Sequence, residues 1–182
     1  MLPLRVPMSA LRTLNLGPGQ EPRPGAVTVD LRRAPGVTVV GDAHRLPFPD
    51  GVFLEIHTAS VLEHSSDPYA VLDEIHRVLR STGRLEIRVP SPWGVWGQVD
   101  RTHVFLADLR LWRDILEGYF DGVRVTSEGA RYRDNALLRA LTRLCIRVLG
   151  WHELAEYWRF ECSEKLTLPQ RRYLPWWLED SR

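Results

Sequence analysis

The stretch Thr13-Leu-Asn-Leu-Gly-Pro-Gly19 places a short apolar run directly before a turn that contains two glycines. The run predicts a β-strand. The glycines allow the backbone after that strand to approach a ligand closely, and to adopt conformations that a side chain would forbid. A strand followed by Gly-x-Gly can also be a simple tight turn, so the residues that follow decide the fold.

Carboxylates stand at the ends of the next two predicted strands. Asp30 closes the run Ala26–Leu31, and Asp42 follows the run Val37–Val40. The carboxyl ends of parallel strands meet at one edge of a sheet, where open α/β sheets bind ligands. We therefore expect both carboxylates to lie beside the glycine turn, where Asp30 could accept hydrogen bonds from the two hydroxyls of a ribose.

Strands and helices alternate along the rest of the chain. Further strands are predicted at Val52–Thr58, Arg84–Pro90, near Val123–Thr126 and within Tyr157–Leu168; helices are predicted from Pro68, capped by Asp67, at about Ala107–Tyr119 and near Asn135–Leu149. This alternation predicts an α/β fold with a mostly parallel sheet. We expect one domain over residues 1–168, followed by a C-terminal tail at 169–182.

The strands also alternate between apolar and polar residues, which is unusual for a buried parallel sheet. In Val52–Thr58, Leu54 and Ile56 are predicted to point to the apolar side, and Glu55 and His57 to the opposite side. The connections at 20–25 and 32–36 are too short for crossover helices. We therefore predict that one sheet face is polar and poorly covered by helices; solvent, the C-terminal tail or a second subunit could lie against it.

Composition gives no sign of a charged macromolecular partner. The 182-residue chain has a formal net charge of +1, and no basic, aromatic-interleaved stripe that would bind nucleic acid. Cys145 and Cys162 have no metal or redox spacing, and the histidines away from the predicted site have no partners at ligand spacing, so no metal is expected. Residues 1–10 lack the apolar region of a signal peptide, and no apolar run approaches the about 20 residues of a membrane span. We expect a soluble cytoplasmic protein.

Taken in order, several motifs resemble the class I S-adenosylmethionine-dependent methyltransferase family in its small, short form. They are LNLGPG (14–19), VDL (29–31), GDAHRLPFPDGVF (41–53), VLEHSSDP (61–68), EIHRVLRSTGRLEIRVPS (74–91) and DRTHV (100–104). The resemblance implies a Rossmann-like seven-stranded sheet of order 3-2-1-4-5-7-6, with S-adenosylmethionine as cofactor. It implies cofactor-binding roles for Gly17, Pro18, Gly19, Asp30, Leu31, Asp42, Ala43, Ser60 and Val61. In the family pattern the glycine turn borders methionine and ribose, Asp30 holds the ribose, and Asp42 meets the adenine.

Two histidines are candidate catalytic residues, His64 after the fourth strand and His103 in the loop after the fifth. Methyl transfer from a sulfonium requires a general base only if the acceptor must lose a proton. Either imidazole could serve, or each could fix loop geometry through a hydrogen bond. Glu63 could be the base instead, or it could form a cap or an ion pair.

The leading hypothesis is methyl transfer to a small molecule or to a glycan- or lipid-linked intermediate. Leu54 stands where an Asp is usual in the family, and this change and the thin sheet motivate the alternative of a non-catalytic binding or scaffold protein. A nicotinamide dehydrogenase is a third hypothesis, although the turn lacks the third glycine of G-x-G-x-x-G.

The helix near Asn135–Leu149 has Arg139, Arg143 and Arg147 opposite a row of leucines. We expect its leucines to cover the sheet and its arginines to be solvated. Peripheral contact with an anionic membrane is the alternative, and a homodimer is also left open.

Overall fold

The computed structural model describes residues 12–18, 22–129 and 135–170. Its centre is a seven-stranded sheet in the order β3-β2-β1-β4-β5-β7-β6, which confirms the predicted order. The strands are β1 (Thr13–Leu16), β2 (Val27–Asp30), β3 (Val39–Val40), β4 (Phe53–Ala59), β5 (Leu79–Pro90), β6 (Phe120–Glu128) and β7 (Tyr157–Lys165). The strands β1 to β5 are parallel, whereas β7 runs antiparallel to both β5 and β6.

The helices are α1 (Pro68–Val78), α2 (Val95–Val99), α3 (Leu109–Leu116) and α4 (Ala136–Leu144), with 3-10 turns at Leu62–His64 and His152–Leu154 and a π-helical turn at Cys145–Leu149. Helix α1 begins as predicted, because the Asp67 side chain accepts a hydrogen bond from the Ala70 N–H at 3.0 Å and Pro68 occupies the first turn. Asp108 caps α3 in the same way. Helix α2 was not predicted, since five residues are too few to show a helical period.

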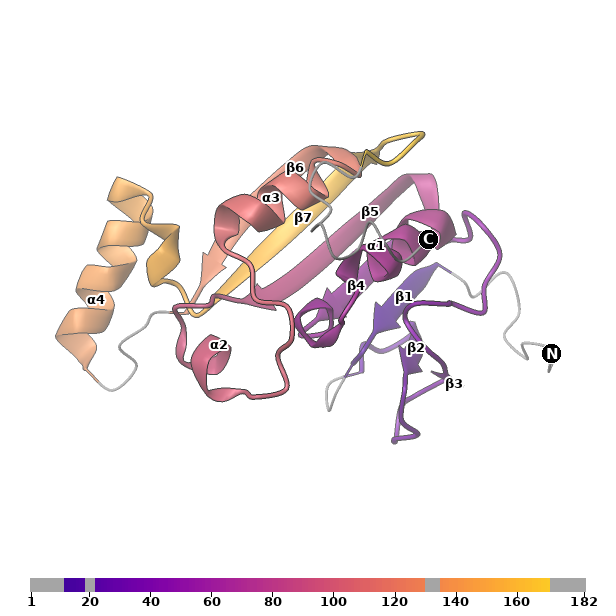
Figure 1. Cartoon of the computed structure of the whole chain (residues 1–182), viewed down its shortest axis with the longest axis horizontal. Helices are drawn as coiled ribbons and strands as arrows, with labels where there is room; N and C mark the ends of the chain where they lie inside the picture. The colour runs from indigo at the N-terminus through magenta and orange to yellow at the C-terminus, as the bar shows by residue number, and fades with distance from the viewer. Residues whose placement is uncertain (1–11, 19–21, 130–134, 171–182) are drawn as a thin grey trace.

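The hydrophobic core lies on one face of the sheet, between the strands and helices α1 and α3 (Figure 1). Strand residues such as Leu14, Ile56 and Ile87 are buried against Leu72 of α1 and Trp112 of α3. The alternation in the strands therefore marks the covered face correctly.

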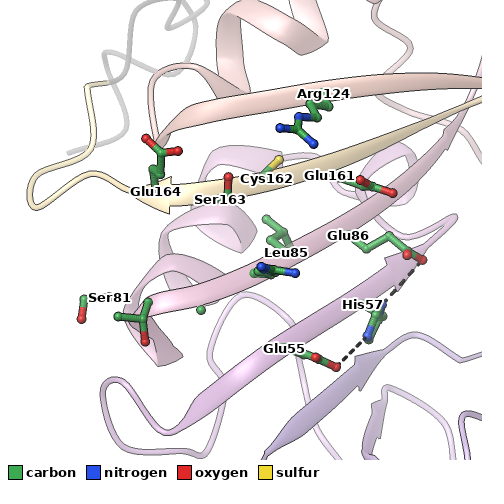
Figure 2. Close-up of a pocket in the computed structure, with 13 residues that line it drawn as sticks. Glu55, His57, Ser81, Leu85, Glu86, Arg124, Glu161, Cys162, Ser163 and Glu164 are labelled. Atoms are coloured by element: carbon green, nitrogen blue, oxygen red, sulfur yellow. Dashed lines mark ion pairs between the residues drawn. The ribbon is translucent and has the colours of Figure 1, made fainter.

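The opposite face is polar, as predicted. It carries ion pairs between strands, among them Arg88 of β5 with Glu128 of β6 at 2.8 Å, which spans the intervening β7. It is hollowed into a groove of about 760 Å³ between β4, β5 and β7. Figure 2 shows His57 in this groove between two carboxylates, with nitrogen to oxygen distances of 3.8 Å to Glu55 and 3.6 Å to Glu86.

Two local predictions were wrong. The pairing of β4 with β5 shifts register between Phe53 and Glu55, so Phe53 is fully buried and Leu54 is only half-buried. The shift is a bulge, which strict alternation does not anticipate. Strand β5 starts at Leu79, directly after α1, and not at Arg84.

The prediction that the helix near Asn135–Leu149 covers the sheet was also wrong. The apolar side chains Leu137, Leu141 and Val148 are exposed, and α4 projects beyond one end of the sheet (Figure 1). An amphipathic pattern establishes that an apolar face exists but does not identify what that face contacts. None of the helices in the described part of the chain combines the length and apolar character needed to cross a bilayer.

Candidate functional site

A cavity of about 280 Å³ opens at the carboxyl ends of β1, β2 and β4. It is lined by Leu16, Gly17, Val29, Asp30, Leu31, Gly41, Asp42, Ala43, His44, Ser60, Val61, His64, Ser65 and Val71. The structure thus brings together most of the residues that the sequence analysis selected from four separate segments. Pro18 is not among the lining residues, and Gly19 lies outside the described residues.

Gly17 turns the chain sharply at the end of β1. Its φ of 61° lies in the left-handed region, and its N–H donates to the Val29 carbonyl at 2.8 Å. A Cβ at this position would clash with the Val61 side chain. Only glycine allows the turn and the β4 loop to approach each other this closely.

Asp30 is held at the end of β2 by its own turn. One carboxylate oxygen, Oδ1, accepts the Arg32 N–H at 2.9 Å, and the Asp30 carbonyl accepts the Gly41 N–H at 2.9 Å. These bonds fix the carboxylate at the cavity wall. They also tie the end of β2 to the loop that carries Asp42.

Asp42 belongs to a chain of hydrogen bonds through His44, a residue that the sequence analysis did not select. The His44 N–H lies 2.9 Å and its Nδ1 lies 2.7 Å from Asp42 Oδ1, and His44 Nε2 lies 2.8 Å from Ser65 Oγ. The His44 backbone N–H first, and then its imidazole, lower the pKa of Asp42 below its ordinary value. Asp42 is therefore a fixed anion at neutral pH. The spacing Asp42-x-His44 is the signal that could have indicated this pair.

Ser60 has a strained backbone at the carboxyl end of β4. Its φ of 53° is in the left-handed region, which non-glycine residues rarely adopt, and its N–H donates to the Arg88 carbonyl at 3.0 Å. Such strain is concentrated at functional sites. Sequence alone gave no sign of it.

The carboxyl group of Glu63 is buried beside the cavity. The residue is only 1% exposed, and neither side-chain oxygen has a hydrogen-bond partner of good geometry among the described residues. Burial raises the pKa of Glu63, and this outweighs the lowering effects of its own backbone amide, of His64 and of the nearby Ser60 hydroxyl. The backbone carbonyl of Glu63 accepts the N–H groups of Val104 and Phe105 at 2.8 and 3.0 Å, which draws the loop after β5 toward the site.

That loop places His103 against His64. The ring centroids lie 4.8 Å apart at an interplanar angle of 59°, and His64 Nδ1 lies 3.2 Å from the Thr102 carbonyl oxygen. The His103 side chain is almost fully buried, with Nε2 at 3.7 Å from an oxygen of Asp100. Burial lowers the pKa of His103 by more than the neighbouring Asp100 raises it, so its neutral form is favoured. His64 lines the cavity, whereas His103 is not among the lining residues and contacts the ring of His64.

One candidate ligand atom each from Glu63, His64 and His103 lie within 4.8 Å of one another. Two imidazoles and a carboxylate are ligand types that suit a transition metal. This group is therefore the part of the described chain that could hold a cation at the site.

Known proteins resemble the chain in sequence. A family model described as a methyltransferase domain matches residues 19–87. A demethylmenaquinone methyltransferase from Thermotoga maritima is 34% identical over 113 residues, which is 62% of this chain. The chain spans only 47% of the length of that relative.

Solved structures resemble the chain in fold. An S-adenosylmethionine-dependent methyltransferase from Archaeoglobus fulgidus has a TM-score of 0.61 at 16% identity, covering 84% of this chain and 85% of the other. Phosphoethanolamine N-methyltransferase 2 from Haemonchus contortus, solved in complex with S-adenosyl-L-methionine, has a TM-score of 0.56 at 15% identity, covering 85% of this chain and 49% of the other. At these identities the likeness establishes the fold alone.

Proposed function

We propose that this chain is a class I S-adenosylmethionine-dependent methyltransferase, which binds S-adenosylmethionine and transfers the methyl group of this cofactor to an organic acceptor. The observation that carries the proposal is the convergence of Gly17, Asp30 and Asp42 on one cavity. These residues come from three separate segments, which the parallel strands bring to one edge of the sheet.

The cofactor would lie across the carboxyl ends of β1 and β2. The Asp30 carboxylate would accept hydrogen bonds from the ribose hydroxyls, and Asp42 would accept one from the adenine amino group. Leu31 is 71% exposed at the cavity wall, so an adenine ring would cover apolar surface that is otherwise in water. The sharp turn at Gly17, together with Pro18, would border the methionine part.

The reactive methyl group would point toward Ser60, Val61 and His64. In-line displacement at a sulfonium requires mainly that the two reactants are aligned and that water is excluded. Binding sites for cofactor and acceptor at fixed positions would supply both. An acceptor that must lose a proton would give it to the pair formed by His64 and His103. The lowered pKa of His103 keeps this imidazole neutral, and therefore able to accept a proton, at neutral pH.

We propose a small molecule, or a glycan- or lipid-linked intermediate, as the acceptor. The name of the Thermotoga relative specifies demethylmenaquinone, which is neither a nucleic acid nor a protein. The acceptor would enter beside His64, which lines the cavity and which contacts His103 and Thr102 of the loop at 100–106.

Isothermal titration calorimetry with S-adenosylmethionine and S-adenosylhomocysteine tests the proposal. Saturable binding at one site, together with methyl transfer to a member of an acceptor panel, is the expected result. Absence of binding up to millimolar ligand would overturn it and favour the alternative, a scaffold protein that keeps only the fold.

A further inference from the structure

Helix α4 presents an apolar face to solvent. Leu137 is 69%, Leu141 47%, Leu144 51% and Val148 64% exposed. Ile146, in the π-helical turn that extends α4, packs against the hydrophobic core, and Thr142, one turn earlier on the same side, is buried. We use the name α4 arm for residues 135–151, which contain α4 and the π-helical turn that extends it.

The charge of the α4 arm has a single sign. It carries Arg139, Arg143 and Arg147, and residues 135–151 contain no aspartate or glutamate. Arg143 and Arg147 are exposed. An apolar stripe with arginines on the polar face of the same helix is the pattern of a helix that lies in the interface of an anionic bilayer.

A second group of exposed apolar residues lies at the same end of the sheet. Trp93, Val95, Trp96 and Val99, in and before α2, are all about half exposed. Strand β5 ends at Pro90, which pairs with Tyr157, and Tyr157 pairs with Glu128 at the end of β6. The segments that carry α2 and the α4 arm therefore leave the sheet from one end (Figure 1).

That end is also the end of the cavity. Strands β1, β2 and β4 run parallel to β5, so the residues after their carboxyl ends open on the same side as α2. Glu156, five residues after the α4 arm, links α2 to the end of β6, because its carboxylate accepts the Val95 N–H at 2.9 Å and its own N–H donates to the Glu128 carbonyl.

We propose that the α4 arm, assisted by the exposed residues of α2, docks this protein on an anionic phospholipid surface. The leucines would enter the boundary between headgroups and acyl chains, and the arginines would contact lipid phosphates. A second copy of the chain fits less well. In a two-fold contact between leucine faces, the arginines of each copy would find no carboxylate on the other copy's arm, whereas an anionic bilayer offers them phosphates.

Docking in this orientation would turn the mouth of the cavity toward the bilayer. The acceptor would then be a molecule that resides in the membrane, such as a lipid-linked intermediate. This last step rests on the proposed methyl transfer, whereas the docking itself does not.

Sedimentation with vesicles tests the docking without cofactor or acceptor. The full chain is expected to bind vesicles that contain equal amounts of phosphatidylcholine and phosphatidylglycerol. Its affinity for vesicles of pure phosphatidylcholine is expected to be lower by about tenfold or more. The double variant Leu141→Ser, Leu144→Ser is expected to lower binding to the mixed vesicles by about tenfold or more. The charge-reversal variant Arg143→Glu, Arg147→Glu should weaken binding to the mixed vesicles to a similar extent. At high salt, its difference from the unmodified chain should disappear.

Leu168→Ser is the matched control, because Leu168 is 78% exposed but follows the far end of β7. It should bind vesicles as the unmodified chain does. Absence of vesicle binding by the unmodified chain would overturn the proposal, as would a dimer in light scattering that Leu141→Ser with Leu144→Ser converts to a monomer. Because these measurements contain no cofactor, they are independent of the calorimetric test of methyl transfer.

Discussion

The rings of His64 and His103 lie with their centroids 4.8 Å apart, although one follows β4 and the other lies in the loop after β5. The contact is held by backbone atoms: the Glu63 carbonyl accepts the N–H groups of Val104 and Phe105, immediately after His103. The relative position of the two imidazoles therefore depends on the backbone of these two loops.

The first prediction concerns His103 as a base. His103→Asn should lower kcat by on the order of 100-fold for an acceptor that loses a proton, while the affinity for S-adenosylmethionine stays the same. Because burial lowers the pKa of His103, the acid limb of the kcat profile should lie below the ordinary histidine value of 6.5. Steady-state kinetics across pH, with calorimetry on the same variant, measure both effects. An unchanged kcat would assign His103 a purely structural role.

The second prediction concerns Gly17. Replacing it with alanine should lower the free energy of unfolding by about 2–4 kcal/mol and abolish cofactor binding, since the variant has an unfavourable φ and a clash with Val61. Urea denaturation measures the loss of stability, and calorimetry measures the loss of binding.

Gly51→Ala is the matched control for that experiment. Its φ of 60° is almost identical, but a Cβ there meets no atom within 4 Å. It should cost only the backbone strain, about 1 kcal/mol, and leave cofactor binding intact. Equal losses in the two variants would mean that the contact with Val61 is unimportant.

The third prediction concerns Asp30. Asp30→Ala should weaken S-adenosylmethionine binding by about 2–3 kcal/mol, because charge-assisted hydrogen bonds to the ribose are lost, with little change in unfolding temperature. Asp121→Ala, at an exposed position of β6, serves as the control. Equal affinities of the two variants would show that the ribose lies elsewhere.

The fourth prediction concerns the buried Glu63. Burial raises its pKa above the ordinary 4.5, so the folded chain holds this proton more tightly than the unfolded chain does. The group's contribution to stability is thus present below pH 4.5 and is lost as the pH rises through the raised pKa. The variant Glu63→Gln has no carboxyl group to ionise at this position. Its free energy of unfolding should therefore rise relative to that of the unmodified chain between about pH 5 and about pH 8. Urea denaturation at both pH values measures the difference, and the opposite trend would indicate a partner that stabilises the carboxylate.

The fifth prediction concerns metal ions. Methyl transfer from a sulfonium does not require one, so EDTA should leave turnover and cofactor affinity unchanged, even though Glu63, His64 and His103 could hold a cation. A loss of turnover that zinc restores would show that this group works as a metal site.

The polar sheet face could be predicted from local sequence patterns, whereas the strand order was implied by the resemblance to the methyltransferase family. Alternating residues mark the two faces, and the short connections at 20–25 and 32–36 rule out crossover helices there. The same logic predicts that Asp30 and Asp42 meet, since parallel strands place their carboxyl ends together.

Features that depend on tertiary contacts could not be predicted in this way. The bulge beside Leu54 arises from a register shift between two strands. The burial of Glu63 depends on the folded environment of the turn that carries it, and the role of His44 depends on its distance from Ser65. The exposure of Leu141 shows that a helical pattern carries no information about the surface that it meets.

The floor of the cavity is formed by Leu16, Val29 and Val71, which also belong to the hydrophobic core. A substitution that reshapes this floor would therefore weaken the whole fold, whereas the exposed side chains of the loop at 100–106 and of the α4 arm can change at little thermodynamic cost. In evolution or in the laboratory, selectivity for the acceptor should therefore change readily on this fold, while the cavity that would bind the cofactor stays nearly constant.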